Sequence, residues 1–179
     1  MTSCTRLLLF AAALVIPSAG FGHPVAALQA AESFYAHYQK LKVSGLPAAK
    51  ESAQMAPHLS KGLQALPRKA KSEPVRGMKA EPDDKGPWVE GDLFTSNFEG
   101  FTRFEEMPEA GDRVAVQFRY TGNGQTFAWE DEVWMKREGG RWVVDDDFYR
   151  RTAGFTSGFG ASLRTSLTGP GWPLASVTL

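Results

Sequence analysis

Two aspartates in the last third of the chain, Asp131 and Asp146, are the residues whose type and spacing could do chemistry. Each lies in a segment of alternating apolar residues, on the apolar side of the alternation. A carboxyl group among apolar neighbours resists ionisation, and two such groups at diagonal positions of neighbouring strands, about 7–8 Å apart, can share a proton. Such a pair suits general acid–base catalysis, the anchoring of a polar ligand group, or structural hydrogen bonding.

Three strands joined by tight turns must position these carboxylates. Residues 114–120, 127–136 and 142–149 alternate between apolar and polar types, which predicts strands. Asn123-Gly124 and Gly139-Gly140 lie between them and are strong signals for two-residue hairpin turns. The sequence therefore predicts an antiparallel meander.

The two turns set a register for this meander. The first turn pairs Phe118 with Trp129, and the second pairs Met135 with Val144 and Asp131 with Phe148. Both turns then place the same residues on one face, whereas a slip of one residue would scatter them. Besides Asp131 and Asp146, this face is predicted to carry Val114, Val116, Phe118, Tyr120, Phe127, Trp129, Val133, Met135, Trp142, Val144 and Phe148.

Helical spacing precedes the strands. Tyr35 and Tyr38 belong to an apolar stripe that starts after Pro24 and predicts a first helix. A second helical region runs from Pro47 to Leu66, where Pro57 divides it and Pro67 closes it. Residues 67–90 are predicted to form a loop, and residues 98–106 are predicted to form an earlier strand. Helices followed by a meander indicate the α+β class.

The opposite face of the predicted sheet is acidic, with Glu130, Glu132, Asp145 and Asp147. Glu132 is expected to lie opposite Asp147 as a like-charge pair that needs solvent, an arginine or a cation. The histidines His23, His37 and His58 lack zinc-binding spacing, although His37 and His58 could meet across two helices. We expect no metal site and no cofactor.

The first 22 residues are expected to be a signal peptide. The chain has 179 residues, and Arg6 precedes an apolar run over 7–16 that is too short to span a membrane. Cleavage after Gly20 or Gly22 would place the protein in the periplasm or outside the cell. Lys+Arg and Asp+Glu both number 20, which argues against a nucleic-acid partner. We expect one domain over 23–168 and a C-terminal tail over 169–179.

Several short segments resemble one protein family. They are Ser33-Phe34-Tyr35, residues 90–96, Phe98-Glu99-Gly100, residues 141–146 and Ser162-Leu163-Arg164. Together they are similar to the exported domain of unknown function 3828 family, within the nuclear transport factor two-like (cystatin-like α+β) superfamily. The resemblance implies a cone in which a curved antiparallel sheet wraps around the N-terminal helices, with a pocket between them. It also implies that Asp146 faces the first helix, near Tyr35 and Tyr38.

The preferred functional interpretation is an exported, non-catalytic binding protein. Its aromatic-lined pocket is predicted to be formed by Tyr35, Tyr38, Phe118, Trp129, Asp131, Trp142, Asp146 and Phe148. One alternative is a small hydrolase, isomerase or dehydratase that uses Asp131 and Asp146 as catalytic carboxylates. Another is a protein-interaction or inhibitor module that uses the acidic face, a face through which a homodimer could also form.

Overall fold

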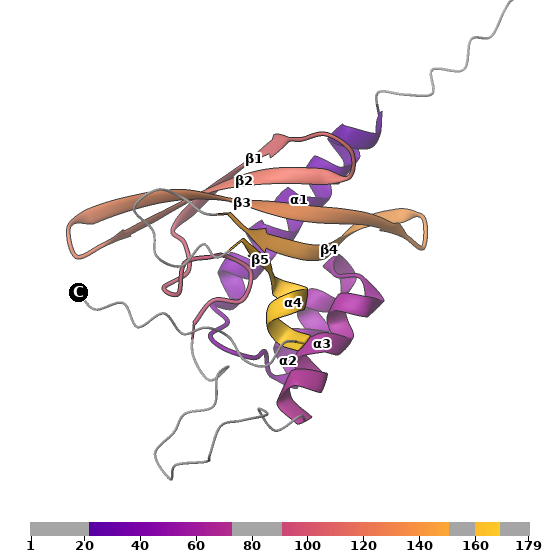
Figure 1. Cartoon of the computed structure of the whole chain (residues 1–179), viewed down its shortest axis with the longest axis horizontal. Helices are drawn as coiled ribbons and strands as arrows, with labels where there is room; N and C mark the ends of the chain where they lie inside the picture. Colours follow the sequence, from indigo (N-terminus) through magenta and orange to yellow (C-terminus); the bar gives the residue numbers. More distant parts are fainter. Residues whose placement is uncertain (1–21, 73–90, 151–159, 169–179) are drawn as a thin grey trace, which may run out of the picture.

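The computed structural model describes residues 22–72, 91–150 and 160–168. The chain has an α+β architecture in which helices precede one antiparallel sheet of five strands, in the order β1-β2-β3-β4-β5 (Figure 1). The elements are α1 (Gly22–Leu41), α2 (Ala49–Met55), the 3-10 turn η1 (Ala56–His58), α3 (Lys61–Ser72), β1 (Arg103–Pro108), β2 (Arg113–Gly122), β3 (Gln125–Glu138), β4 (Arg141–Tyr149), β5 (Ala161–Ser162) and α4 (Leu163–Thr168).

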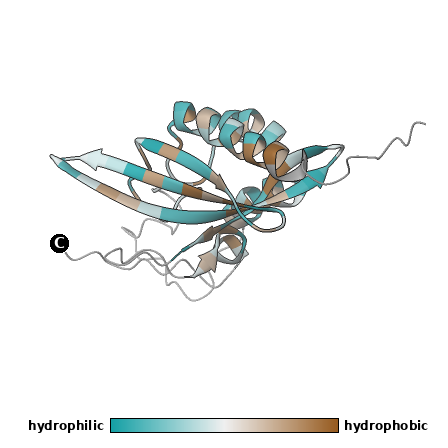
Figure 2. Ribbon diagram, turned by 90° about the horizontal axis from the view of Figure 1, so that it is seen from above, coloured by the Kyte–Doolittle hydropathy of each residue, from teal (hydrophilic) through white to brown (hydrophobic). Residues whose placement is uncertain are grey.

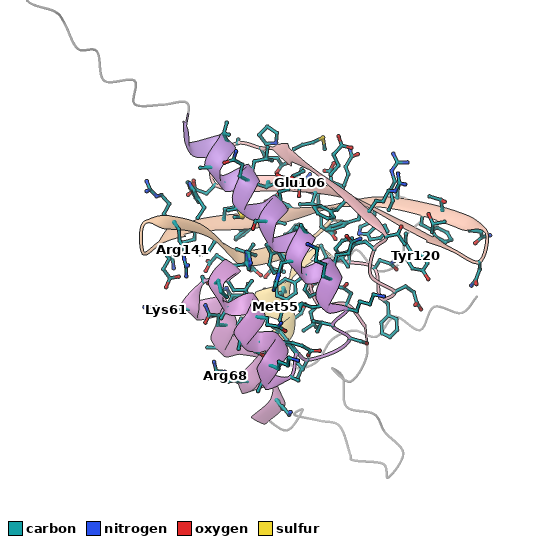
Figure 3. All side chains as sticks on the ribbon, turned by 180° about the vertical axis from the view of Figure 1, so that it is seen from behind. Met55, Lys61, Arg68, Glu106, Tyr120 and Arg141 are labelled. Atoms are coloured by element: carbon teal, nitrogen blue, oxygen red, sulfur yellow. The ribbon has the colours of Figure 1, made fainter. Side chains whose placement is uncertain are left out.

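Helix α1 crosses one face of the sheet, which is called the inner face below (Figure 3). Seen from above, α1 lies on one side of the strands (Figure 2). Its buried residues Ala31, Phe34, Tyr35 and Tyr38 follow the three-and-four spacing of a single helical stripe. They pack against strand residues of the inner face in one hydrophobic cluster. The predicted first helix is confirmed.

The second helical region divides at Pro57, as predicted, into α2, η1 and α3. Its predicted end at Pro67 is wrong, because α3 continues to Ser72 with Pro67 inside it. Burial explains the continuation, since Leu66 and Ala70 on either side of Pro67 both pack against the hydrophobic cluster. Proline weakens a helix by removing one hydrogen bond, and packing of this kind can outweigh that loss.

The register between β2 and β3 is the predicted one. Phe118 pairs with Trp129, and Val116 pairs with Asp131. Asn123 adopts a positive φ of 51° and Gly124 one of 74°. These are the left-handed conformations that a tight hairpin turn of this type requires.

The register between β3 and β4 contains a bulge that the sequence did not predict. Val144 pairs with Met135 as expected, but Asp146 pairs with Trp134, so Asp145 is an extra residue in β4. From Asp146 to the end of β4, each side chain therefore lies on the face opposite to the one predicted. Asp147 and not Asp146 therefore lies on the inner face.

The remaining predictions are confirmed in part or concern residues that the structure does not describe. The strand expected over 98–106 is β1, which begins at Arg103. Residues 1–21, 73–90, 151–159 and 169–179 are outside the described residues, so the signal peptide (apart from Gly22), most of the expected loop and the tail are not addressed by the structure. In the ranges that are described, no helix combines the length and apolarity needed to cross a bilayer.

Candidate functional site

Helix α1 and the inner face of the sheet enclose three carboxylates, Asp92, Asp131 and Asp147, which are called the acid cluster below. Tyr35 and Tyr38 are three residues apart on α1, so both side chains point toward the sheet. The Tyr35 hydroxyl donates a hydrogen bond of 2.9 Å to Asp147 Oδ2. The Tyr38 hydroxyl donates one of 2.7 Å to Asp92 Oδ1. The helix therefore supplies a hydrogen-bond donor to two of the three acids.

Asp131 is fully buried and accepts hydrogen bonds at both oxygens. Oδ2 accepts from the Ser96 N–H at 2.8 Å and from the Trp129 indole and the Thr95 hydroxyl, both at 3.3 Å. Oδ1 accepts from the Arg150 N–H at 3.2 Å. Burial raises the pKa of Asp131 to about 6, while the N–H donors pull it in the opposite direction. Asp131 is therefore mostly ionised at neutral pH.

Asp147 and Asp92 are also perturbed by burial. Burial and the nearby charge of Asp131 raise the pKa of Asp147 well above its usual range. Within the described part of the chain, its Oδ1 is buried without a hydrogen-bond partner. Burial raises the pKa of Asp92 to about 7, although the Tyr38 hydroxyl and the Phe94 N–H favour its ionised form. Burial therefore favours the protonated form of each acid in the cluster.

The partners of the acid cluster show what it does in the fold. Asp92 accepts from the Phe94 N–H at 2.8 Å, and the Tyr149 hydroxyl donates to the Leu93 carbonyl at 2.7 Å. Like the bond from the Ser96 N–H to Asp131, these contacts fix the irregular backbone that precedes β1. Two of the three acids are 0% exposed. The arrangement is suited to holding a loop beneath the sheet.

The structure brings together five of the predicted pocket residues: Tyr35, Tyr38, Phe118, Trp129 and Asp131. The Tyr35 and Phe118 rings are 5.2 Å apart, and the Phe118 and Trp129 rings are 5.6 Å apart. All five residues are buried. Aromatic rings at these separations pack directly against one another. They form a filled core and not the wall of a pocket found in the described residues.

Of the other three predicted pocket residues, two lie on the outer face and one lies at the margin of the hydrophobic cluster. Asp146 and Phe148 are on the outer face, because the bulge shifts β4 by one residue. Asp146 Oδ1 accepts the Arg164 N–H at 2.8 Å and so holds the start of α4. The Phe148 ring stacks on Trp134, with centroids 6.4 Å apart. Trp142 is half-buried at the margin of the hydrophobic cluster. The predicted pairing of Asp131 with Asp146 is therefore wrong, and Asp147 takes that place.

The acidic side chains of the outer face are paired with arginines. The Arg150 guanidinium contacts Glu109 at 2.6 Å, Glu132 at 2.5 Å, and Glu130. Arg113 contacts Glu132 at 3.1 Å. The predicted like-charge pair is not formed, because β4 turns Asp147 inward and places Phe148 opposite Glu132. Glu132 was expected to need solvent, an arginine or a cation, and in the structure it is paired with arginines.

An open groove of ligand size lies between the helical region and the β3–β4 hairpin. Its volume is about 560 Å³. Ligand sites commonly measure about 300–1,000 Å³. The groove is called the hairpin groove below, and it is lined by Ala53, Ala56, Pro57, Leu59, Lys61, Gln64, Glu138, Gly139, Arg141 and Val143. Sequence reasoning missed it; the Gly139-Gly140 turn, with basic Arg141 next to it, was the only local signal.

The hairpin groove exists because the helical region docks against β4 near Val144, away from the two residues of β4 that pair with β5. Leu59 forms a parallel bridge with Val144, and the Ser60 N–H donates to the Val144 carbonyl at 2.8 Å. Ser60 also begins α3, since its Oγ accepts the Leu63 N–H at 3.1 Å. This docking holds the start of α3 beside the turn of the hairpin.

Charged groups line the rim of the hairpin groove. Glu138 Oε2 accepts the backbone N–H of Lys61 at 3.2 Å. The Gln64 amide is committed to backbone carbonyls of η1 and the residue after it, at 2.9 and 2.7 Å. The side-chain cations of Lys61 and Arg141 make no hydrogen bond or ion pair with residues of 22–72, 91–150 or 160–168. Figure 3 shows Lys61 and Arg141 at the same edge of the molecule.

The two helix-borne histidines meet, as the sequence suggested. The His37 and His58 rings stack with centroids 5.2 Å apart. Burial, followed by the neighbouring His37 and Arg141, lowers the pKa of His58. Among the described residues, no group of three or more His, Cys, Asp or Glu side chains could hold a metal ion.

Comparisons with known proteins add little. No family model matches the chain, and no curated protein matches it. One similar solved structure is the crystal structure of a protein of unknown function from Bacteroides thetaiotaomicron. The sequences are 14% identical, and the match covers 69% of this chain and 89% of the other, with a TM-score of 0.43. This similarity is too low to assign a family or a function.

Proposed function

We propose that this protein is an exported, non-catalytic binding protein whose small ligand occupies the hairpin groove. The observation that carries the proposal is a groove of about 560 Å³ lined by small apolar side chains together with the polar residues Lys61, Gln64, Glu138 and Arg141. Small-molecule sites commonly have this size. The proposal keeps the predicted class of function and moves the site from the aromatic core to the edge of β4.

The acid cluster gives less support to catalysis. Asp131 and Asp147 are fully buried, and Asp131 uses both oxygens to hold backbone and side-chain donors. A catalytic carboxylate must reach substrate, directly or through one water. Perturbed pKa values also arise in structural networks. The catalytic alternative would require the core around Tyr35 and Phe118 to open.

A neutral fluorescent probe tests the proposed site. N-phenyl-1-naphthylamine should bind the wild-type protein with increased fluorescence. Ala56→Trp places an indole in the groove and should abolish this increase. Ala128→Trp makes the same change on an exposed residue of β3 and should leave the increase intact. Equal binding to both variants would reject the hairpin groove as the site.

Export and family membership are part of the same proposal. The apolar run over 7–16 and the small residues after it support cleavage after Gly20 or Gly22 and a periplasmic or secreted protein. Mass spectrometry of the mature chain tests this, since an intact N-terminus would reject it. The helix-covered antiparallel sheet supports a nuclear transport factor two-like cone of the domain of unknown function 3828 family.

A second candidate function is protein interaction through the outer face. Trp134 is 38% exposed there and packs against Phe148 and under the Arg113 guanidinium, 5.2 Å from the ring centroid. Exposed aromatic and arginine side chains are enriched at interfaces. A homodimer through this face should be weakened in Trp134→Ala, as measured by sedimentation. A monomer at all concentrations would exclude the homodimer.

A further inference from the structure

The charged residues that line the hairpin groove indicate the charge of its ligand. Lys61 and Arg141 bring two positive charges to its rim and Glu138 brings one negative charge, so the lining keeps a net charge of one positive. The two side-chain cations have no counter-ion among the residues that are described. A ligand with one negative charge would neutralise the lining, whereas a dianion would leave it with a net negative charge.

The position of the Glu138 carboxylate shows which part of the rim is left for a ligand. Its Oε2 accepts the Lys61 N–H at the start of α3, where unpaired backbone N–H groups and the helix dipole favour an anion. The start of α3 is thus already bonded to a carboxylate of the chain itself. Arg141 and the Lys61 ammonium remain available to a second anion. Arginine binds carboxylates with two parallel hydrogen bonds.

The apolar residues of the lining indicate the chemistry of the uncharged part of the ligand. The apolar part of the lining consists of alanine, proline, leucine and valine side chains, and Gln64 has its amide hydrogens engaged elsewhere. Apolar surface of this kind stabilises an aliphatic or aromatic body by removing it from water. Polar recognition is therefore concentrated at the rim.

From the groove, its apolar lining residues and the two cations at its rim that have no counter-ion among the described residues, we infer that the ligand is an amphipathic monocarboxylate. Its carboxylate lies between Arg141 and Lys61, and its apolar body lies along Ala56 and Val143. This inference rests on the proposed function, because it assumes that the hairpin groove is the binding site.

Decanoate and decanol test the inference, because they share an alkyl chain and differ in charge. Titration calorimetry of the full chain should show decanoate binding at least about tenfold more tightly than decanol. Arg141→Gln should weaken decanoate binding by about tenfold and leave decanol binding unchanged. Glu138→Gln should strengthen decanoate binding by removing the like charge. Arg119→Gln, on an exposed arginine of β2, is the matched control and should change neither affinity.

The outcomes separate this inference from the proposed function. Equal binding of decanoate and decanol, with both lost in Ala56→Trp, would overturn the carboxylate inference and leave the groove as the site. An equal loss of both ligands in Arg141→Gln would also overturn it. Failure of both ligands and of N-phenyl-1-naphthylamine to bind would overturn the inference together with the proposed function. Weakening of decanoate alone between about 50 and about 300 mM salt would support the ion pair.

Discussion

Replacement of Asp92 by asparagine should make the protein more stable at alkaline pH. Burial raises the pKa of Asp92 from 3.8 to about 7. Between these values the folded protein keeps a proton that the unfolded chain has lost, so stability decreases as the pH rises through this window. The side chain of asparagine can keep the two hydrogen bonds that Asp92 Oδ1 accepts from Tyr38 and Phe94. It cannot ionise, so its stability should not decrease in this window.

The magnitude follows from the two pKa values. Their difference of 7 − 3.8 = 3.2 corresponds to about 4 kcal/mol, at about 1.36 kcal/mol for each pKa unit. Asp92 is partly exposed, and solvent screening reduces this figure, so we expect a gain of about 2–4 kcal/mol at pH 8 and almost none at pH 4.

Urea unfolding at a series of pH values measures the effect of Asp92→Asn. The free energies of unfolding of wild type and variant should diverge between pH 4 and pH 8. Asp112→Asn, at an exposed aspartate before β2, is the control and should run parallel to wild type. Parallel curves for Asp92→Asn as well would refute the reasoning, since they would mean that the folded state does not perturb this carboxyl group.

Two further substitutions test the inner and outer faces. Tyr35→Phe removes the hydroxyl that donates to Asp147 and should reduce the free energy of unfolding by about 1–3 kcal/mol; unchanged urea unfolding would contradict that hydrogen bond. Arg150→Met leaves three glutamates without their shared cation and should destabilise the protein by about 1–3 kcal/mol at pH 8. The loss should shrink as the pH falls below the usual glutamate range, because Glu132, whose pKa is lowered by its contacts with Arg150 and Trp134 despite burial, then loses its charge. An equal loss at pH 8 and pH 3 would argue against the ion-pair network.

Local signals were sufficient for the first hairpin. Asn123-Gly124 can adopt the positive φ values of a tight turn, and the alternation on both sides of it fits only one register, which the structure confirms. The same logic correctly placed Trp129 and Asp131 on the inner face. Tyr35 and Tyr38 followed from helical spacing for the same reason, since a single element determines each of these positions.

In the second hairpin, the alternation of apolar and polar residues does not determine the register. The bulge lies within three successive aspartates, 145–147, so shifting the chain by one residue exchanges one aspartate for another. The residues that follow, Phe148 and Tyr149, are both aromatic and would suit either face. What decides the register is tertiary contact: the Tyr149 hydroxyl reaches the Leu93 carbonyl, and α4 begins against Asp146. Neither contact is visible in the local sequence.

The hairpin groove was unpredictable for a related reason. It depends on the docking of residues around Leu59 against Val144, which are far apart in the chain. No residue type in its lining is unusual by itself. Only the packing of the helical region against β4 brings Lys61 and Arg141 to one rim.

A nuclear magnetic resonance titration of the labelled full chain with N-phenyl-1-naphthylamine tests the central claim most directly. If the hairpin groove is the binding site, the largest shifts should occur at the backbone amides of Ala53, Ala56, Arg141 and Val143. Largest shifts around Phe118 and Asp131, with the groove amides unchanged, would instead place the ligand in the aromatic core and contradict the account.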